Sequence, residues 1–323
     1  MDYTHLGRSG LVVSRLCLGT MNFGPLTDEA DAHALMDKAH DHGINFFDTA
    51  NRYGRDLGVG ATESLIGRYF AKGGGRRERT VLATKGYGAM GDWPNEDRLS
   101  ALNLRRALDA SLARLQTDYV DLYQFHHVDP TTPWEEIWQA MEVAVAQGKV
   151  LYVGSSNFAA WNLVEAQAAA TSRHFMGLVS EQSIYNLLTR EVELEVLPAA
   201  RRLGIGVLPW SPLHGGLLGG ALRRQGGGRR RLEERAAATL ERRRPQLEAF
   251  ESLAGELGHE PGDLALAWLL HQPAVTAPIV GPRTADHLDR ALHALELRLD
   301  DAVLARLDGI FPPYRPAPEH YAW

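Results

Sequence analysis

The sequence predicts an α/β fold, a closed (β/α)8 or TIM barrel with an N-terminal β-hairpin and long loops on its C-terminal face. Short β-prone segments alternate along the chain with segments of helical periodicity, which indicates parallel strands joined by crossover helices. Eight such strands fit a chain of 323 residues, a usual size for one barrel. Since no linker divides the sequence, we expect residues 1–323 to form a single domain.

The expected elements follow in order from the N-terminus. Two β-prone pieces flank the turn Gly7–Gly10 and predict the hairpin. The barrel strands are expected at Arg15–Met21, Asn45–Ala50, Thr80–Lys85, Tyr119–His126, Val150–Ser156, Leu178–Ser183, Gly206–Trp210 and Ala277–Val280. The helices are expected at Asp28–Asp41, Thr62–Phe70, Leu99–Leu115, Pro133–Gln147, Ala159–Thr171, Glu191–Leu203 and Thr284–Leu295. Helical periodicity is clearest where Leu104, Leu108 and Leu112 recur on one face.

Residues 213–245 depart from this rhythm and are expected to form a long basic loop. Between Ala221 and Pro245 there are nine arginines against three glutamates, whereas the whole chain has a net charge of −6. Two interpretations stay open for such a charge run: a solvated loop, or a mobile lid near an anionic cofactor. The run Gly226–Gly228 favours mobility in either case.

Composition excludes several classes of protein. With 45% hydrophobic and 23% charged residues the chain is ordinary for a globular protein, and its negative charge argues against nucleic-acid binding. Cys17 is the only cysteine, which excludes an intrachain disulfide and fits a reducing compartment. No apolar run is long enough for a membrane span. We therefore expect a cytoplasmic enzyme or binding protein with no nucleic-acid or membrane partner; the oligomeric state is not set.

Polar side chains of four types stand at or just after the ends of three successive predicted strands. Asp48 is followed by Tyr53 in the next loop, Lys85 ends the third strand and His126 ends the fourth. Because the carboxyl ends of barrel strands face a common site, we expect these side chains to meet. Each alone also fits a structural role, as a cap, a surface charge, a packing phenol or a core histidine; the set in register favours a functional site.

The four side chains together suit carbonyl reduction, in which a hydride added at carbon is matched by a proton added at oxygen. A phenol with a pKa near 10 is a poor acid at neutral pH, but an adjacent ammonium lowers that pKa. Tyr53 beside Lys85 is therefore a candidate acid, with Asp48 holding the lysine charged. His126 can bind the carbonyl oxygen or relay a proton. We expect no metal, although the pair His126 and His127 with Asp129 leaves a weaker metal alternative open.

These residues stand in motifs that resemble those of the aldo-keto reductases, most closely the branch with bacterial aldo-keto reductases and potassium-channel β subunits. The motifs occur in family order along nearly the whole chain: Asn45-Phe-Phe-Asp-Thr-Ala followed by Tyr53, Ala83-Thr-Lys, Asp121-Leu-Tyr-Gln-Phe-His, and Gly154-Ser-Ser-Asn-Phe. The resemblance implies Tyr53 as general acid, Lys85 and Asp48 as its tuning pair, and His126 as the residue that orients the substrate. His127 is the next candidate if its strand is out of register by one residue.

The resemblance also implies where a nicotinamide cofactor binds. Ser156, Asn157 and Gln182 resemble the residues that hydrogen-bond the nicotinamide carboxamide. Trp210 resembles the aromatic residue that stacks on the ring, although core packing at the barrel rim remains open for it. The residues implied along the rest of the nicotinamide half and the pyrophosphate are Gly19, Thr20, Met21, Asp48, Ser211, Leu213, Gly215, Gly216 and Leu217.

At the adenosine end, the segment from Gly281 to His287 resembles the family's site for an adenosine 2′-phosphate. Arg283 and a helix N-terminus both suit a phosphate, which implies NADP(H). Ala291 stands where the family usually has an asparagine, so NAD(H) is not excluded.

Two functions from different classes are therefore expected. The first is an NADPH-dependent reductase of small aldehydes or ketones, and the alternative is a cofactor-binding regulatory or assembly subunit like the potassium-channel β subunits. A Schiff-base aldolase acting through Lys85 is a third, weakened because Asp48 would keep the lysine protonated.

Overall fold

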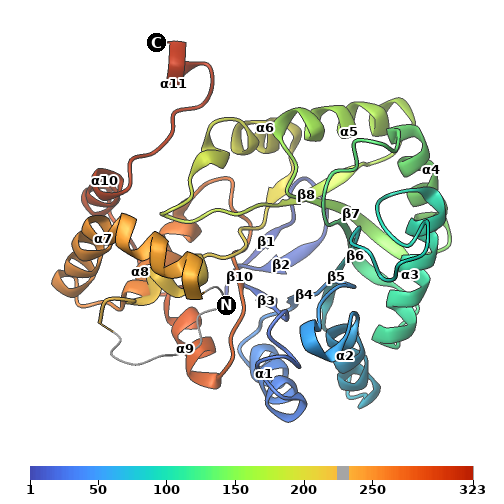
Figure 1. Cartoon of the computed structure of the whole chain (residues 1–323), viewed down its shortest axis with the longest axis horizontal. Helices are drawn as coiled ribbons and strands as arrows, with labels where there is room; N and C mark the ends of the chain where they lie inside the picture. The colour runs from blue at the N-terminus through green and yellow to red at the C-terminus, as the bar shows by residue number, and fades with distance from the viewer. Residues whose placement is uncertain (224–232, 323) are drawn as a thin grey trace.

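The computed structural model describes residues 1–223 and 233–322, and its strands form one eight-stranded parallel sheet and a separate two-stranded hairpin (Figure 1). The hairpin consists of β1 (Tyr3–His5) and β2 (Val12–Ser14). The sheet has the order β10-β3-β4-β5-β6-β7-β8-β9. Its strands are β3 (Cys17–Gly19), β4 (Phe46–Asp48), β5 (Val81–Gly86), β6 (Val120–Phe125), β7 (Val150–Ser156), β8 (Leu178–Gln182), β9 (Gly206–Val207) and β10 (Ile279–Val280).

The sheet closes on itself, because its two end strands are joined through the chain beside them. Val207 of β9 forms a parallel bridge with Val275, and the amide of Thr276 donates to the carbonyl oxygen of Val207 at 2.9 Å. The amide of Ile279 donates to the carbonyl oxygen of Pro209 at 2.8 Å. Closure removes the free edges that an open sheet would leave. The predicted (β/α)8 barrel with its N-terminal hairpin is confirmed.

Helices surround the strands, as the ring of coiled ribbons in Figure 1 shows. The α-helices are α1 (Glu29–Asp41), α2 (Ala61–Ala71), α3 (Ala101–Leu115), α4 (Trp134–Ala146), α5 (Ala160–Ser172), α6 (Val196–Leu203), α7 (Glu233–Glu256), α8 (Pro261–His271), α9 (Ala285–His293), α10 (Asp301–Ile310) and α11 (Glu319–Ala322). Three short 3₁₀ helices are η1 (Arg55–Leu57), η2 (Glu191–Glu193) and η3 (His214–Gly219). Side-chain caps explain several starts; for example, the Asp28 carboxylate accepts from the amide of Asp31 at 2.9 Å.

The barrel interior is filled by side chains, and the hairpin covers its N-terminal end. Leu6 and Val13 of the hairpin region belong to the same buried cluster as residues of the barrel strands. The other members of this cluster are Cys17, Phe46, Ala83, Leu122, Val179, Leu208, Ala277 and Ile279. A filled interior leaves the carboxyl ends of the strands as the place for a site.

Strand periodicity carries this inward face up to the carboxyl ends. The inward-facing core residues of β4, β5 and β6 are Phe46, Ala83 and Leu122. Because side chains two residues apart share a face of a strand, the next inward positions are those of Asp48, Lys85 and Gln124. Three successive strands thus each place a polar side chain directly above the apolar filling.

The segment 213–245 differs from the predicted long loop. Residues from His214 to Gly219 form η3, and Glu233 already begins helix α7. Residues 224–232, on which much of the lid interpretation falls, lie outside the described residues.

Helix α7 forms through Pro245 because one of its faces is apolar and packed. Leu240 and Leu247, seven residues apart, are 8% and 0% exposed. On the outer face Arg244 donates to the Glu241 carboxylate at 2.5 Å. The basic run that indicated a loop is therefore, in its second half, the solvated side of an amphipathic helix.

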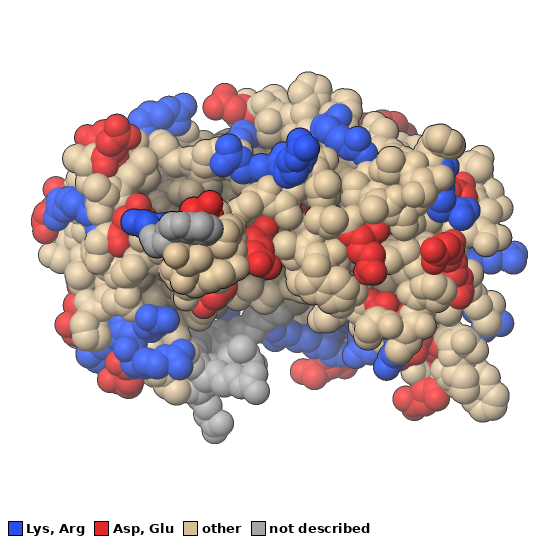
Figure 2. Space-filling model, turned by 90° about the horizontal axis from the view of Figure 1, so that it is seen from above, with Lys and Arg blue, Asp and Glu red and all other residues tan. Residues whose placement is uncertain are grey.

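Acidic and basic side chains of the described residues are interspersed over the face of the molecule in Figure 2. Among the described helices, none is both long and apolar enough to cross a membrane.

Candidate active site

A buried ion pair joins the ends of β4 and β5. The Nζ of Lys85 donates to Oδ2 of Asp48 at 2.6 Å, and the two side chains are 0% and 3% exposed. The same Nζ donates to the carbonyl oxygen of Thr49 at 2.9 Å and to the hydroxyl of Tyr53 at 3.3 Å. Removing a charge from water costs several kcal/mol, so a buried ammonium needs such a full set of acceptors. All three hydrogens of the Lys85 ammonium are engaged.

The surroundings keep Lys85 charged. Burial is the largest influence on the pKa of Lys85 and acts to lower it. The carboxylate of Asp48 and the phenol of Tyr53 together outweigh burial, so the pKa of Lys85 lies above its usual value. A protonated lysine at this position stabilises negative charge on the Tyr53 oxygen.

The second oxygen of Asp48 is held by two side-chain amides. Its Oδ1 accepts from Nε2 of Gln124 at 3.0 Å and from Nε2 of Gln182 at 2.9 Å. The two glutamines also contact each other, with Nε2 of Gln182 3.2 Å from Oε1 of Gln124. Both amides are buried, where unmade hydrogen bonds are costly. The carboxylate is thus fixed by partners from β5, β6 and β8.

Tyr53 is half-buried in the turn that follows β4. Its amide donates to the carbonyl oxygen of Ala50 at 3.1 Å, which closes the turn. Gly54 comes next with a φ of 148°, a conformation that strongly favours glycine. A Cβ at this position would collide with the carbonyl oxygen of Gly58. The turn therefore requires glycine, and it brings the phenol of Tyr53 back to Lys85.

His126 lies directly after β6 with its ring edge-on to Tyr53. The ring centroids are 6.1 Å apart and the ring planes make an angle of 78°. Burial, with a further contribution from the charge of Lys85, lowers the pKa of His126 to about 3, so its imidazole is neutral at neutral pH. His127 is exposed and lies against Tyr87 instead, with 5.5 Å between their centroids. The strand register thus brings His126, and not His127, beside the phenol.

The residues predicted at the nicotinamide end lie together in a chain of hydrogen bonds. Nε1 of Trp210 donates to Oδ1 of Asn157 at 3.0 Å, and Nδ2 of Asn157 donates to Oγ of Ser156 at 3.0 Å. The Ser156 hydroxyl donates to the carbonyl oxygen of Gln182 at 2.8 Å. Asn157 also donates to the carbonyl oxygen of His126 at 3.2 Å. This polar group is therefore connected directly to the residues around Asp48.

The buried carboxylate of Glu181 forms hydrogen bonds with residues next to this chain of hydrogen bonds. It accepts from the hydroxyls of Ser155 and Ser183 at 2.5 and 2.7 Å and from the amide of Phe158 at 3.1 Å. Burial raises the pKa of Glu181, and the hydrogen bonds partly oppose this shift. The Ser155 and Phe158 bonds fix the backbone on either side of Asn157, whose φ of 61° is uncommon outside glycine.

The residues predicted along the pyrophosphate form an open strip of backbone. Ser211, Gly215 and Gly216 have φ values of 51°, 65° and 99°. A Cβ on either glycine would meet no atom of the described residues within 4 Å, so residues 1–223 and 233–322 leave space beside this backbone. Leu217 is buried and anchors the strip, while Leu213 is half-buried. An exposed backbone with successive left-handed residues is suited to close approach by a phosphate.

The loop after β3 connects the candidate catalytic residues to the segment predicted to bind the adenosine end of the cofactor. Gly19 is paired in register with Asp48, and the Thr20 hydroxyl donates to the carbonyl oxygen of Asp48 at 2.9 Å. Beyond the half-buried Met21, Nδ2 of Asn22 donates to the carbonyl oxygen of Gly281 at 2.9 Å. A single short loop therefore spans the distance between the two ends of the expected cofactor site.

Arg283 and His287 lie at the N-terminus of α9. Oγ1 of Thr284 accepts from the amide of His287 at 3.3 Å and caps the helix. The amide of Arg283 donates to Nδ1 of His287 at 3.4 Å. A capped helix start beside an arginine is favourable for an anionic group.

Asp129, the acidic residue of the weaker metal alternative, is occupied by hydrogen bonds that hold the loop after β6. It accepts from the amides of Leu99 and Thr131 at 3.1 and 2.9 Å and from the Thr132 hydroxyl at 2.7 Å. Within residues 1–223 and 233–322, no three His, Cys, Asp or Glu side chains are grouped so that they could hold a metal ion.

Comparison with known proteins decides the family. A family model described as "Aldo/keto reductase family" matches residues 15–311. The chain belongs to this family. It is 56% identical over 328 residues to an uncharacterized oxidoreductase, YrpG, of Bacillus subtilis (strain 168), and the match covers 100% of both chains.

More distant relatives include a reductase and a channel subunit. The chain is 32% identical to versiconal hemiacetal acetate reductase of Aspergillus parasiticus, over 97% of this chain and 98% of the relative. It is also 32% identical to a probable voltage-gated potassium channel subunit beta of Arabidopsis thaliana, over 99% and 100%. Aldo/keto reductases generally bind nicotinamide cofactors and act on small carbonyl compounds. Membership of the family supports an oxidoreductase.

Sequence reasoning about this aldo/keto reductase missed two residues of the site, Gln124 and Glu181. Gln124 is the position two before His126 on the same strand, so period-two alternation within Asp121–Phe125 could have found it. Glu181 stands in the middle of a buried strand, where a carboxylate needs several partners.

Proposed function

We propose that this aldo/keto reductase reduces aldehydes or ketones to alcohols with NADPH, with Tyr53 as the general acid. The observation that carries the proposal is the buried line of contacts from Asp48 through Lys85 to the Tyr53 hydroxyl. A buried ion pair rarely stabilises a fold on balance, because desolvation offsets the attraction between the charges, so its presence beside a phenol favours a functional role.

The chain's own residues supply the proton and the orientation. As the carbonyl oxygen gains negative charge, Tyr53 transfers its proton to it, and the alcohol forms. The Lys85 ammonium, 3.3 Å from the phenol oxygen, stabilises the phenolate left behind. Tyr53 is half-exposed, so solvent can return the proton. Neutral His126 donates one hydrogen bond to the carbonyl oxygen of the substrate without adding a second positive charge beside Lys85.

The polar side chains of this site and the space beside Gly215 and Gly216 are suited to a nicotinamide cofactor. A bound NADPH supplies the hydride. Ser156, Asn157 and Gln182 would hold its carboxamide, and Trp210 would cover its ring. The free space beside Gly215 and Gly216 suits a pyrophosphate, and Arg283 at the start of α9 suits a 2′-phosphate.

The alternative function is that of a cofactor-binding regulatory subunit, favoured by the full-length similarity to a probable potassium channel subunit beta. The aldolase alternative is weakened further, because a Lys85 whose three hydrogens are engaged and whose pKa is raised is a poor nucleophile.

A turnover assay tests the proposal. Loss of NADPH absorbance is followed with a panel of aliphatic and aromatic aldehydes and ketones, for the wild type and for Tyr53→Phe. We expect the variant to bind NADPH as the wild type does and to lose roughly 10²- to 10⁴-fold in kcat. Equal rates for the two proteins would show that Tyr53 is not the acid. NADPH binding without turnover of any substrate would favour the regulatory subunit.

A further inference from the structure

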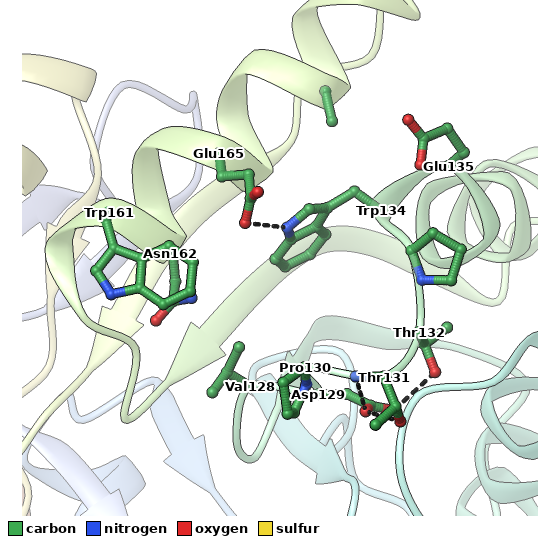
Figure 3. Close-up of a pocket in the computed structure, with 12 residues that line it drawn as sticks. Val128, Asp129, Pro130, Thr131, Thr132, Trp134, Glu135, Trp161, Asn162 and Glu165 are labelled. Carbon is green, nitrogen blue, oxygen red and sulfur yellow. Dashed lines mark hydrogen bonds between the residues drawn. The ribbon is translucent and has the colours of Figure 1, made fainter.

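A hollow of 570 Å³ lies outside the site described so far, between the loop after β6 and the outer face of α5 (Figure 3). Its volume is within the range of small-molecule sites, roughly 300–1,000 Å³. The loop Val128–Pro133 and the starts of helices α4 and α5 surround it.

Two indoles border the hollow. Trp161 is 64% exposed, which is unusual for so large an apolar side chain. Trp134 is held in place from two sides: its ring stacks on Trp138 with 5.7 Å between centroids, and its Nε1 donates to Oε2 of Glu165 at 3.2 Å. In Figure 3 the Glu165 carboxylate lies between the two indoles. Trp161 and Glu165 share a face of α5 because they are four residues apart.

The charge of the lining is entirely negative. Asp129, Glu135 and Glu165 line the hollow, and no lysine, arginine or histidine does. Asp129 accepts from the amides of Leu99 and Thr131 and from the hydroxyls of Thr131 and Thr132, and Arg98 lies 4.0 Å from it. Among the described residues, no cationic nitrogen lies within 4.0 Å of Glu135 or Glu165. Arg173, which is paired with Glu142, also interacts with Glu135 at longer range. Within the described part of the chain, Glu165 is therefore the carboxylate of this lining without a cationic partner of that kind.

We propose that this hollow binds a small organic ammonium ion, of which a quaternary ammonium is the best fit. An ammonium ion placed against an indole face is attracted by the ring quadrupole, most strongly for tryptophan. Its methyl groups suit the apolar surface of Trp161 and Pro130, while Glu165 supplies the counter-charge. Aromatic rings arranged around the ammonium ion are the chemistry by which proteins recognise such ions.

Binding of choline to the full-length protein tests this proposal. Titrations at constant ionic strength compare choline with 3,3-dimethyl-1-butanol, its neutral isostere, and are followed by calorimetry. We expect saturable binding of choline and at least roughly 10-fold weaker binding of the isostere. Trp161→Leu and Glu165→Gln should each weaken choline binding roughly 2- to 30-fold.

Matched controls are available on the same chain. Trp93→Leu removes another tryptophan, 76% exposed, that does not line the hollow, and Glu248→Gln removes a surface carboxylate of α7. Both controls should bind choline as the wild type does, and both Trp161→Leu and Glu165→Gln should keep the wild-type NADPH affinity.

Three results would overturn the proposal. Equal affinity for choline and its isostere would show a merely apolar hollow. Choline binding unchanged by Trp161→Leu would place the ion elsewhere. Tighter binding of N-acetyl-lysine-methylamide than of choline would assign the hollow to a lysine side chain of a protein partner instead of a small quaternary ion.

Discussion

The cluster around Lys85 and the glycine strip of η3 lie at the same rim of the barrel but are built in opposite ways. In the cluster, Lys85 and Asp48 are 0% and 3% exposed and each of their polar atoms has a partner. In the strip, a Cβ on Gly215 or Gly216 would meet none of the described residues within 4 Å. In the function proposed above, the fold therefore prearranges the groups that would move a proton, and it leaves backbone exposed where the cofactor would bind.

The largest expected effect comes from breaking the buried pair. Lys85→Met leaves the Asp48 charge buried without a counter-ion and should cost about 3–5 kcal/mol of unfolding free energy. Urea denaturation measures this loss, and kcat should fall with it. The matched control is Lys149→Met, because Lys149 and Asp109 also lie 2.6 Å apart but are 35% and 44% exposed. That exposed pair should contribute less than about 1 kcal/mol. Equal losses of stability in the two variants would show that burial does not set the Lys85–Asp48 pair apart from a surface ion pair.

The next largest effect is expected at the side-chain amides that hold Asp48, if they position this carboxylate for catalysis. Gln124→Leu removes one donor from Oδ1 of Asp48 and should cost about 1–3 kcal/mol of stability together with a lower kcat/KM. Gln246→Leu is the control, since its amide donates to the carbonyl oxygen of Ile310 at 2.9 Å away from the site. A loss of stability with unchanged kcat/KM in Gln124→Leu would make this glutamine purely structural.

A substitution in the glycine strip should weaken NADPH binding and leave kcat unchanged, whereas the substitutions in the cluster around Lys85 lower stability and activity. Gly216→Ala introduces a Cβ into free space at a φ of 99°, so we expect a cost on the order of 1 kcal/mol from the backbone alone. NADPH should bind several-fold more weakly, with kcat kept, as fluorescence titration and turnover would show. Gly54→Ala, which collides with Gly58, should instead damage folding and kcat together. Unchanged NADPH affinity in Gly216→Ala would separate the strip from the cofactor.

The smallest effect concerns pH. Unfolded His126 takes up a proton near pH 6.5, whereas the folded residue does so only near pH 3. The unfolded state therefore binds more protons in this window, and stability falls as the pH is lowered, by at most about 0.7 kcal/mol between pH 7 and pH 6 from this residue. Urea midpoints should show that His126→Asn loses less stability than the wild type, with His127→Asn as the control. Parallel losses in the wild type and His126→Asn would mean that His126 is not held neutral by the fold.

Much of the barrel could be predicted because its pattern is local. Strands such as Val120–Phe125 and helices such as Ala101–Leu115 follow from runs of apolar residues and from helical spacing. Helix α7 was not predicted, because its many arginines indicated a solvated loop and obscured the apolar residues of one helix face, such as Leu240, and because Pro245 suggested a break. Helix α8 was missed although the alternation requires a helix between β9 and β10, and α10 was missed because it follows the last strand and its helix.

The site was predictable to the extent that it depends on strand ends. Asp48, Lys85 and His126 follow from the rule that carboxyl ends of parallel strands converge. The choice of His126 over His127 needed the register of β6, and the contacts of Gln124 and Gln182 with Asp48 join residues 76 and 134 positions away from it. No local pattern contains contacts of that range, so they became visible only in the folded chain.

Transfer of a labelled hydride tests the central claim most directly. The wild-type protein is given an aldehyde and NADPH carrying deuterium at C4 of the nicotinamide, with each face labelled in turn, and the product alcohol is examined by mass spectrometry and NMR. We predict that one of the two labelled cofactors delivers deuterium to the carbinol carbon, and that Tyr53→Phe slows this transfer without changing which face reacts. An alcohol free of deuterium with both labelled cofactors would contradict hydride transfer at this site.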